Sequence, residues 1–380
     1  MFTLEKQLAT HKGRETYIDN KKFSRILAKV EGGESLTREE GMLLMECEDI
    51  FFLGKLANLI RERKNGNYTY YNINAHLNPS NICVNNCRFC AFSRKEGEPG
   101  AYDLTLEEVI EKVQQIVTKR TTELHIVGGA HPRKNLDFYK TMLSSIKKIY
   151  PQIYLKAFTA VEIQQMADVS GCSVEDALKE LKESGLDFIP GGGAEIFSPR
   201  VRKEICPQKI SGERWLYIHR IAHLMGIKSN ATMLYGHREK AEERIDHLLK
   251  LRELQKETSG FRAFVPLPYH PQNTLLGGKD TTGVLDIKVH ALSRIILDNF
   301  DHIKAYWIMT GCELAQILQS FGVDDLDGTV TEEKITHSAG AKTPQELDEG
   351  YIRYLISSAG RIPVERDTLY NRIGESRGVD

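Results

Sequence analysis

From residue 72 onward, short apolar runs alternate with long amphipathic segments, and this alternation limits the fold more than any other feature of the chain. Short apolar runs predict strands, and long amphipathic segments predict helices. The alternation gives seven or eight strand–helix units before about residue 320. Such units build a parallel sheet with helices packed against it, so we predict an α/β fold closed into a (βα)8 TIM-type barrel.

The predicted elements divide the chain into three parts. Residues 20–65 show helical patterning without a strand signal, and the sequence TREE at Thr37 forms a capping box, so we predict an N-terminal helical extension over residues 1–70. The barrel is predicted over residues 71–345. A C-terminal helix and tail are predicted over residues 346–380.

Within the barrel, the sequence YNINAHLN is the first predicted strand. Capping sequences predict helix starts at Thr105, Thr310 and Thr343, the last with Pro344 at the first helical position. The longer predicted helices span residues 105–119, 135–149, 211–225, 239–257, 284–299 and 311–320.

Charge and apolar patterning narrow the class of partner. The chain has 51 Lys and Arg against 52 Asp and Glu, without a long basic run, so we do not expect binding to nucleic acid. The N-terminus has no apolar core, and no uncharged apolar stretch reaches about 18 residues, so we expect no association with a membrane. We predict a cytoplasmic protein that acts on a small molecule.

Three of the seven cysteines lie close together, in the sequence CVNNCRFC at Cys83, Cys87 and Cys90. A structural zinc ion takes four protein ligands, and His76 is a candidate for the fourth, so zinc stays an alternative. An iron–sulfur cluster with four irons, held by three thiolates, leaves one iron open to bind another group. The other cysteines have no neighbour at ligand spacing, and we interpret Cys172, Cys206 and Cys312 as packing residues.

Other distinctive residues also follow predicted strands, where barrel enzymes carry their sites. They are Gly128 to His131, Gly191 to Glu195, Gly236 to Glu239, and His270. The sequence PGGGAEIF lacks the Lys and Ser or Thr of a phosphate-binding loop, so we do not expect it to bind phosphate. A plain tight turn remains the alternative for each glycine pair.

The CxxxCxxC spacing, with Phe89 before the last cysteine, resembles the radical S-adenosylmethionine (SAM) superfamily. This resemblance implies a 4Fe-4S cluster whose open iron binds the methionine part of SAM, and cleavage of SAM to a 5′-deoxyadenosyl radical. It also implies that Phe89 lies near the adenine, and that the backbone at Gly128 and Gly129 meets the methionine ammonium. Glu195 is a candidate for the ribose hydroxyls of SAM.

Arg202 and Lys209 are candidates for the methionine carboxylate of SAM. Both lie in a charged stretch of the sequence, and we favour the interpretation that they belong to a solvated face.

Longer motifs narrow the resemblance. The sequences HIVGGAHP, ATMLYGHREKAEERIDHL, FVPLPYHPQNT and DDLDGTVTEEKITHSAGA resemble the branch of futalosine-pathway enzymes and deazaflavin (F0) synthase subunits. Within that branch, GGAHP and THSAGA are most similar to the aminofutalosine synthases of menaquinone biosynthesis. Arg238 departs from the pattern, because an apolar residue is expected there.

The resemblance implies that the deoxyadenosyl radical adds to the enolpyruvyl double bond of 3-(1-carboxyvinyloxy)benzoate. Aryl migration and loss of the carboxylate then give 6-amino-6-deoxyfutalosine, with SAM as co-substrate and an electron donor such as flavodoxin or ferredoxin. Dehypoxanthine futalosine cyclase and the deazaflavin synthase subunit remain alternatives. So does an iron–sulfur protein that only transfers electrons.

The enolpyruvyl benzoate carries two carboxylates, which call for cations or several hydrogen-bond donors in the site. Candidates for catalytic or substrate contacts are His131, Arg262, His270 and His337. The acidic pair Glu332 and Glu333 is a candidate for orienting His337 or binding substrate, with a favourable helix-dipole pairing as the alternative.

Overall fold

A curled, parallel seven-stranded sheet forms the centre of the computed structural model, which describes residues 20–374. The strands follow one another in chain order, so each strand–helix unit lies beside the next. This arrangement confirms the predicted α/β TIM-type barrel. The strands of this sheet are β2 (Asn74–Leu77), β3 (Glu123–Ile126), β4 (Tyr154–Ala157), β5 (Phe188–Ile189), β6 (Lys228–Tyr235), β7 (Phe261–Pro268) and β8 (His302–Ile303).

An irregular segment closes the gap between β8 and β2. The amide of Ala305 donates to the carbonyl of Asp325 at 2.9 Å, and the amide of His76 donates to that of Thr331 at 3.0 Å. Isolated parallel bridges join Lys304 to Asp325 and Ala75 to Thr331. The chain around residues 325–331 therefore takes the place of the eighth strand of the predicted barrel. It is joined to β2 and to the residue after β8 by single bridges, and it is not a regular strand of this sheet.

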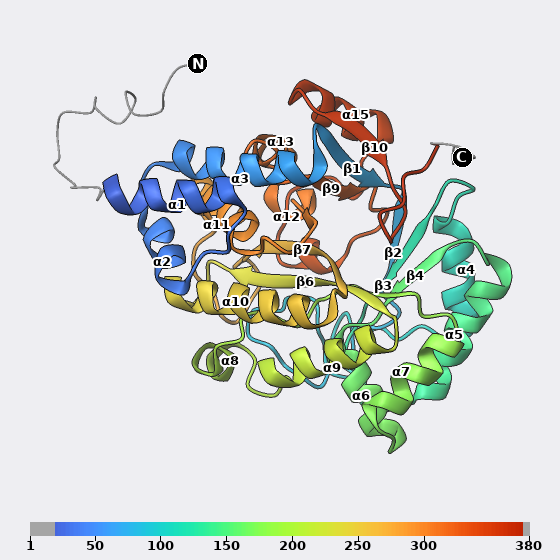
Figure 1. The fold of residues 1–380 in the computed structure, drawn as a ribbon. Helices are drawn as coiled ribbons and strands as arrows, with labels where there is room; N and C mark the ends of the chain where they lie inside the picture. Colours follow the sequence, from blue (N-terminus) through green and yellow to red (C-terminus); the bar gives the residue numbers. More distant parts are fainter. Residues whose placement is uncertain (1–19, 375–380) are drawn as a thin grey trace.

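Helices cover the outside of the sheet, and Figure 1 shows α9 and α10 lying along β6 and β7. Their apolar faces pack on the strands because each carries buried residues at helical spacing. The helices that follow the barrel strands are α4 (Leu106–Ile116), α5 (Leu136–Ile149), α6 (Ala160–Ser170), α7 (Val174–Glu183), α8 (Pro199–Ile205), α9 (Gly212–Leu224), α10 (Ala241–Thr258), α11 (Gly283–Ile296), α12 (Trp307–Thr310) and α13 (Cys312–Leu318).

Three helices precede the barrel, as the sequence predicts: α1 (Asn20–Gly32), α2 (Arg38–Glu46) and α3 (Ile50–Asn65). The structure confirms the capping boxes at Thr37 and Thr105. Helix α3 packs along α11, and α2 packs against α10. The N-terminal helices thus brace the outer layer of the barrel at α10 and α11 (Figure 1).

The first predicted strand is wrong in one respect, because the chain divides it at Ile73. The residues before it form β1 (Tyr68–Asn72), which lies between β9 (Asp325–Gly328) and β10 (Ile362–Glu365) in a separate parallel sheet. The residues after it form β2 in the barrel. Two short helices, α14 (Ile335–Ser338) and α15 (Glu349–Ser358), precede β10. The division into residues 1–70, 71–345 and 346–380 stays a prediction.

Two predicted helix starts are also wrong. Thr310 ends α12, and Gly311, with φ 82°, separates α12 from α13 in a conformation that glycine adopts without strain. The hydroxyl of Thr343 donates to the carbonyl of Ile308 at 2.9 Å, so it does not cap a helix. Helix α15 begins later, where the side chain of Asp348 accepts from the amide of Gly350.

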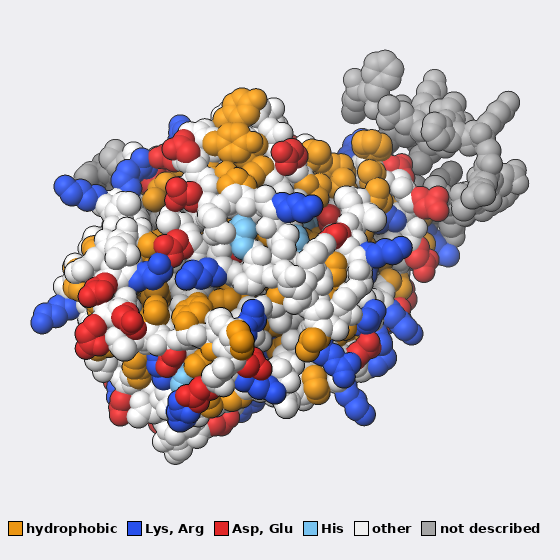
Figure 2. Space-filling view, turned by 180° about the vertical axis from the view of Figure 1, so that it is seen from behind, with side chains coloured by type: hydrophobic (Ala, Val, Ile, Leu, Met, Phe, Trp, Pro, Cys, Tyr) orange, Lys and Arg blue, Asp and Glu red, His pale blue; other side chains and the backbone are white. Residues whose placement is uncertain are grey.

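Acidic and basic side chains lie close together over much of the face drawn in Figure 2. Among residues 20–374, none of the helices has both the length and the apolar character that a membrane span requires.

Candidate active site

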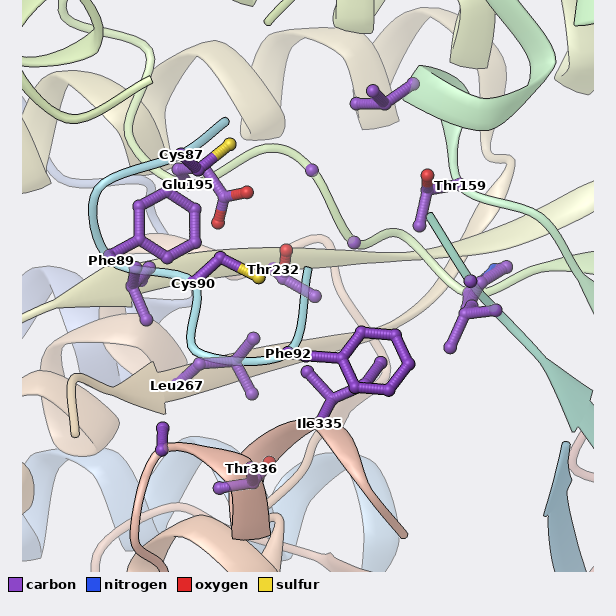
Figure 3. Close-up of a pocket in the computed structure, with 18 of the residues that line it drawn as sticks. Cys87, Phe89, Cys90, Phe92, Thr159, Glu195, Thr232, Leu267, Ile335 and Thr336 are labelled. Carbon is purple, nitrogen blue, oxygen red and sulfur yellow. The ribbon is translucent and has the colours of Figure 1, made fainter. Parts of the chain in front are cut away.

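A cavity of about 330 Å³ opens at the carboxyl ends of the barrel strands. Its wall combines the loop that carries the three cysteines with residues from every strand of the main sheet except β5 and β8, where the residues that follow the strand contribute instead. Figure 3 shows this cysteine loop on one side, with Leu267 and Ile335 facing the same cavity. A concave, mostly apolar pocket with a few polar groups suits a small organic ligand.

The cysteine loop brings Cys83, Cys87 and Cys90 to this one cavity. Its backbone is held on two sides, because the amide of Val84 donates to the carbonyl of Ala130 at 3.0 Å and the amide of Arg88 donates to that of Ile205 at 2.8 Å. The sulfur of Cys90 accepts from the amide of Ser93 at 3.4 Å. Hydrogen bonds to sulfur are a common feature of iron–sulfur sites.

The donor set fits a 4Fe-4S cluster better than zinc. Each cluster iron takes one thiolate, so three cysteines leave one iron for another ligand. His76, the fourth ligand that the zinc alternative needs, packs instead against His125, with ring centroids 4.5 Å apart.

Lys209 contributes a buried positive charge beside the cysteine loop. Its Nζ lies 2.6 Å from Oε1 of Glu195 and 5.2 Å from the centre of the Phe89 ring. Burial raises the pKa of the Cys87 thiol to about 12, and the ammonium of Lys209 opposes that shift by stabilising the thiolate. The interpretation of Lys209 as part of a solvated face is therefore wrong.

Arg202 is also buried, and its guanidinium has a structural role. It donates to the carbonyls of Ala194 at 2.6 Å and Ile196 at 3.3 Å, on either side of Glu195. These bonds hold the loop after β5 so that Glu195 lines the cavity. The predicted solvated face is wrong here too, because the chain folds this charged stretch inward against the loop.

The glycines after β3 allow two backbones to meet. A Cβ atom on Gly129 would lie 2.1 Å from the carbonyl oxygen of Ile82, and one on Gly128 would lie 2.8 Å from that of Ser80. Both close approaches are to the start of the cysteine loop. The amide of Gly128 also donates to Oε1 of Glu162 at 2.8 Å. A side chain at either position would collide with the cysteine loop. This packing alone requires glycine, independently of any contact between the backbone and a ligand.

The floor of the cavity is polar, which the sequence analysis missed. His76, His125 and Lys156 occupy matching register positions on the adjacent strands β2, β3 and β4, and all three line the cavity. Lys304 and Asp327 line it as well and form an ion pair. Burial lowers the pKa of both histidines, so both imidazoles are neutral at pH 7.

Of the four residues predicted for catalytic or substrate contacts, His270 alone lines this cavity. Its Nε2 lies 3.0 Å from the carbonyl oxygen of Met309. Arg262 is the second residue of β7 and lies toward the end of the strand opposite the cavity, so its substrate contact stays a prediction that no observed contact supports.

The side chains of His131 and His337 form hydrogen bonds within their own loops. Nδ1 of His131 accepts from the amides of Arg133 at 3.1 Å and Lys134 at 2.9 Å. His337 lies with Nδ1 3.0 Å from Oε2 of Glu333, which confirms that Glu333 orients it. Neither histidine lines the cavity, and these hydrogen bonds give each a structural role, so direct substrate contact stays a prediction for both.

The remaining predicted residues lie where a core or a surface interaction accounts for them. Cys206 and Cys312 are buried in the hydrophobic core, and Cys172 packs against it, which confirms their interpretation as packing residues. Glu332 pairs with Lys112 at 2.6 Å.

Comparison with known proteins identifies the family to which this cysteine loop and barrel belong. The Radical SAM superfamily model matches residues 77–251, and the CofH/MqnC C-terminal region matches residues 258–377. The chain belongs to the radical SAM superfamily. It is 46% identical to an aminodeoxyfutalosine synthase of Thermus thermophilus, over 92% of this chain and 95% of that protein. It is 43% identical to one of Streptomyces coelicolor, over 93% and 94%.

One further protein is similar to this radical SAM enzyme in sequence, and one solved structure is similar to it in fold. A 5-amino-6-(D-ribitylamino)uracil--L-tyrosine 4-hydroxyphenyl transferase 1 of Methanosarcina barkeri is 41% identical over 89% of this chain and 91% of that protein. The crystal structure of methylornithine synthase (PylB) superposes with a TM-score of 0.72 at 17% identity, over 89% of this chain and 97% of that one.

Membership in the radical SAM superfamily implies a 4Fe-4S cluster and SAM. The chain presents groups that fit both at one end of the cavity, namely the three cysteines together with Phe89, Glu195 and Lys209. A carboxylate can accept hydrogen bonds from ribose hydroxyls, and an ammonium can pair with a carboxylate.

Proposed function

We propose that this radical SAM enzyme is an aminodeoxyfutalosine synthase. It joins the deoxyadenosyl part of SAM to 3-(1-carboxyvinyloxy)benzoate, with aryl migration and loss of the enolpyruvyl carboxylate, to give 6-amino-6-deoxyfutalosine for menaquinone biosynthesis. Two relatives of that name, 46% and 43% identical over more than nine-tenths of the chain, support the proposal. The observation that carries it is one cavity with the cysteine loop at one end and a polar floor that holds two buried lysines at the other.

Cys83, Cys87 and Cys90 would hold the cluster, and Phe89, Gly128, Gly129 and Glu195 would surround SAM. When bound, the reduced cluster and SAM supply a 5′-deoxyadenosyl radical, which adds to the enol ether. The protein has to hold the two reactants at near-attack distance, about 3 to 3.5 Å, and keep water and other hydrogen donors away. Apolar side chains from four parts of the chain line the cavity: Val127, Val265, Leu267, Met309 and Ile335.

The proposed activity requires an electron donor and is expected in the cytoplasm. A cluster that initiates radical chemistry needs an electron from outside the chain, and a small electron carrier of the flavodoxin or ferredoxin type would supply it. The seven cysteines form no disulfide among the described residues, in keeping with a reducing compartment such as the cytoplasm.

A second function has a specific observation in its favour. The 41% identity to a 4-hydroxyphenyl transferase extends over 89% of this chain, and that protein's name gives a uracil and tyrosine as its reactants. Transfer of a tyrosine-derived group to such a uracil is therefore the competing proposal.

Product analysis separates the two functions. The purified protein is reconstituted without oxygen, reduced, and given SAM labelled in its adenosine part together with either the enolpyruvyl benzoate or tyrosine plus the ribitylaminouracil. We expect the label in a nucleoside that also contains the benzoate ring. Label found as 5′-deoxyadenosine, in equal amount with a product that lacks adenine, would favour the transferase.

A further inference from the structure

We propose that the floor of the barrel is an anion subsite that binds the ring carboxylate of the enolpyruvyl benzoate, with Lys156 and Lys304 as its charged donors and His76 and His125 beside them. This inference rests on the proposed function and deepens it. It assigns the orientation of the substrate, with the benzoate end on the floor and the enol ether toward the cysteine loop.

The first observation is that two buried lysines, Lys156 and Lys304, have N–H donors that no acceptor in the described part of the chain fills. Lys156 forms an ion pair with Glu123, and Lys304 forms one with Asp327. An ammonium has three N–H donors. Oδ1 of Asp325 lies 3.7 Å from Nζ of Lys304, beyond hydrogen-bond distance, and among the described residues no further acceptor lies within that distance of either ammonium. Both side chains are at most 4% exposed, yet both line the cavity, so their remaining donors face a space that only a ligand or water can fill.

The second observation is an unpartnered imidazole. Nε2 of His76 is fully buried and lacks a hydrogen-bond partner among the described residues. Its ring packs on that of His125, which stands beside Lys156 in the strand register. Buried polar atoms without partners are uncommon in folded proteins and call for a specific explanation. A carboxylate oxygen over this layer could accept from the lysines and from a ring N–H in one position.

Depth in the barrel decides which carboxylate reaches the floor. His125 lies inside β3, whereas Gly129, which touches the cysteine loop, comes four residues later along the chain. Four residues of extended chain span up to about 13 Å. The vinyl methylene has to lie at the upper level, because the radical forms beside the cysteine loop. The enolpyruvyl carboxylate is close to that methylene, so the ring carboxylate is the one that can reach down.

The charged groups make the floor of the cavity selective for a ligand that carries a carboxylate. The pairs Lys156–Glu123 and Lys304–Asp327 are each neutral, the nearby Asp325 is balanced by Arg366, and both histidines are neutral, so the floor offers donors without an excess of negative charge. A substrate with hydrogen in place of the ring carboxylate would leave the two ammonium groups without the acceptor that they face. A site built around buried polar groups rejects a ligand that fails to pair with them more strongly than an apolar pocket rejects a change in size.

The test measures binding without turnover, using the oxidised, cluster-loaded protein with SAM and no reductant. Three ligands are compared by calorimetry: the enolpyruvyl benzoate, its analogue without the ring carboxylate, and 3-vinyloxybenzoate, which lacks the enolpyruvyl carboxylate. The variant is the double substitution Glu123→Gln and Lys156→Met, which removes an ion pair without changing the net charge. A second variant combines Lys304→Met with Asp327→Asn.

We expect wild-type protein to bind the analogue without the ring carboxylate at least about 30-fold more weakly than the substrate, since bonds to charged groups contribute about 2 kcal/mol. In either double variant, which keeps one of the two lysines, this ratio should fall at least about fivefold below the wild-type ratio. The preference over 3-vinyloxybenzoate should stay as in wild type. A matched control, Lys147→Met, removes a lysine from an ion pair with Asp187 outside the cavity and should preserve both ratios.

Two outcomes would overturn the subsite. One is an unchanged ratio for the ring carboxylate in both double variants with native circular dichroism and full iron content. The other is loss of the preference for the enolpyruvyl carboxylate, which would mean that the substrate binds the other way round. Failure of the proposed function is a separate result, in which wild-type protein neither binds nor converts the enolpyruvyl benzoate.

Discussion

Nζ of Lys209 lies 2.6 Å from Oε1 of Glu195, and this pair joins the segment after α8 to the loop after β5. Burial opposes the charged form of Lys209, but the carboxylate of Glu195 helps to keep its pKa well above the usual value, so the lysine is charged at pH 7. The pair therefore sets the position of Glu195 in the cavity and places a cation beside the cysteine loop.

Replacement of Lys209 by Met should lower the affinity for SAM about tenfold while the protein still assembles its cluster. The reason is that Glu195 loses the cation that holds it, and one broken charged hydrogen bond costs about 1.5 kcal/mol or more. Equilibrium dialysis with SAM and iron analysis give the two readouts. Lys203→Met, on an exposed position of α8, is the control. Equal SAM affinity in the two variants would rule out this positioning role.

Replacement of Gly129 by Ala should reduce the iron content of the reconstituted protein by more than half. The added Cβ would meet the carbonyl of Ile82, and the backbone just before Cys83 cannot yield without moving the cysteine. Gly283→Ala is a matched control, because a Cβ there meets no atom within 4 Å. Full iron content with weaker SAM binding would show that the glycine serves SAM directly.

The ion pair of His337 with Glu333 should make stability depend on pH. The hydrogen bond to Glu333 is the largest contribution that raises the pKa of His337, to about 9. A raised pKa stabilises the fold fully below about pH 6.5, and the contribution disappears as the pH rises through 9. Its size is at most about 3 kcal/mol.

Urea unfolding at pH 6 and at pH 9.5 measures this effect. Wild-type protein should lose more stability between the two pH values than His337→Gln, whose neutral side chain cannot titrate. Parallel pH profiles for the two proteins would contradict the ion pair.

Arg238, where the family resemblance led us to expect an apolar residue, fastens the loops around the cysteines. Its guanidinium lies 3.0 Å from Oε1 of Glu204 and donates to the carbonyl of Leu276 at 3.1 Å. Leu276 in turn donates from its amide to the carbonyl of Arg88, inside the cysteine loop.

Arg238→Ala should therefore release iron to a chelator roughly fivefold faster, as expected for the loss of about 1 kcal/mol, with little change in melting temperature. Arg220→Ala, which breaks a comparable exposed ion pair with Glu257, is the control. Identical release rates in the two variants would leave Arg238 without a role at the site.

Residues that are close in sequence could be predicted as a site, and residues that meet only in the barrel could not. Cys83, Cys87 and Cys90 are recognisable because their spacing is itself the signal. Lys156 lies within an apolar run, where a single lysine is usually read as facing solvent. Its partner Glu123 belongs to the preceding strand, and only the curvature of the sheet turns both inward.

The sequence also did not reveal which of the two histidines beside Pro, His131 and His270, lines the cavity. His131 follows a strand in the correct loop, but the backbone turn after it presents two amides to its ring. Local hydrogen bonding of this kind is decided by turn geometry, which the sequence does not reveal. The split at Ile73 was not predicted either, because β1 and β2 are separated by a single residue and differ in the sheet to which each belongs.

The floor of the cavity depends on residues 362–368. Nε of Arg366 lies 2.7 Å from Oδ2 of Asp325, and the hydroxyl of Thr368 donates to Oε2 of Glu123, the partner of Lys156. These residues leave the ribosome after every barrel strand. During synthesis the cysteine loop and the strands emerge first, so a chain still growing at β8 lacks the completed floor. An enzyme built in this order cannot position a substrate, and so cannot direct its radical, until translation has passed the barrel.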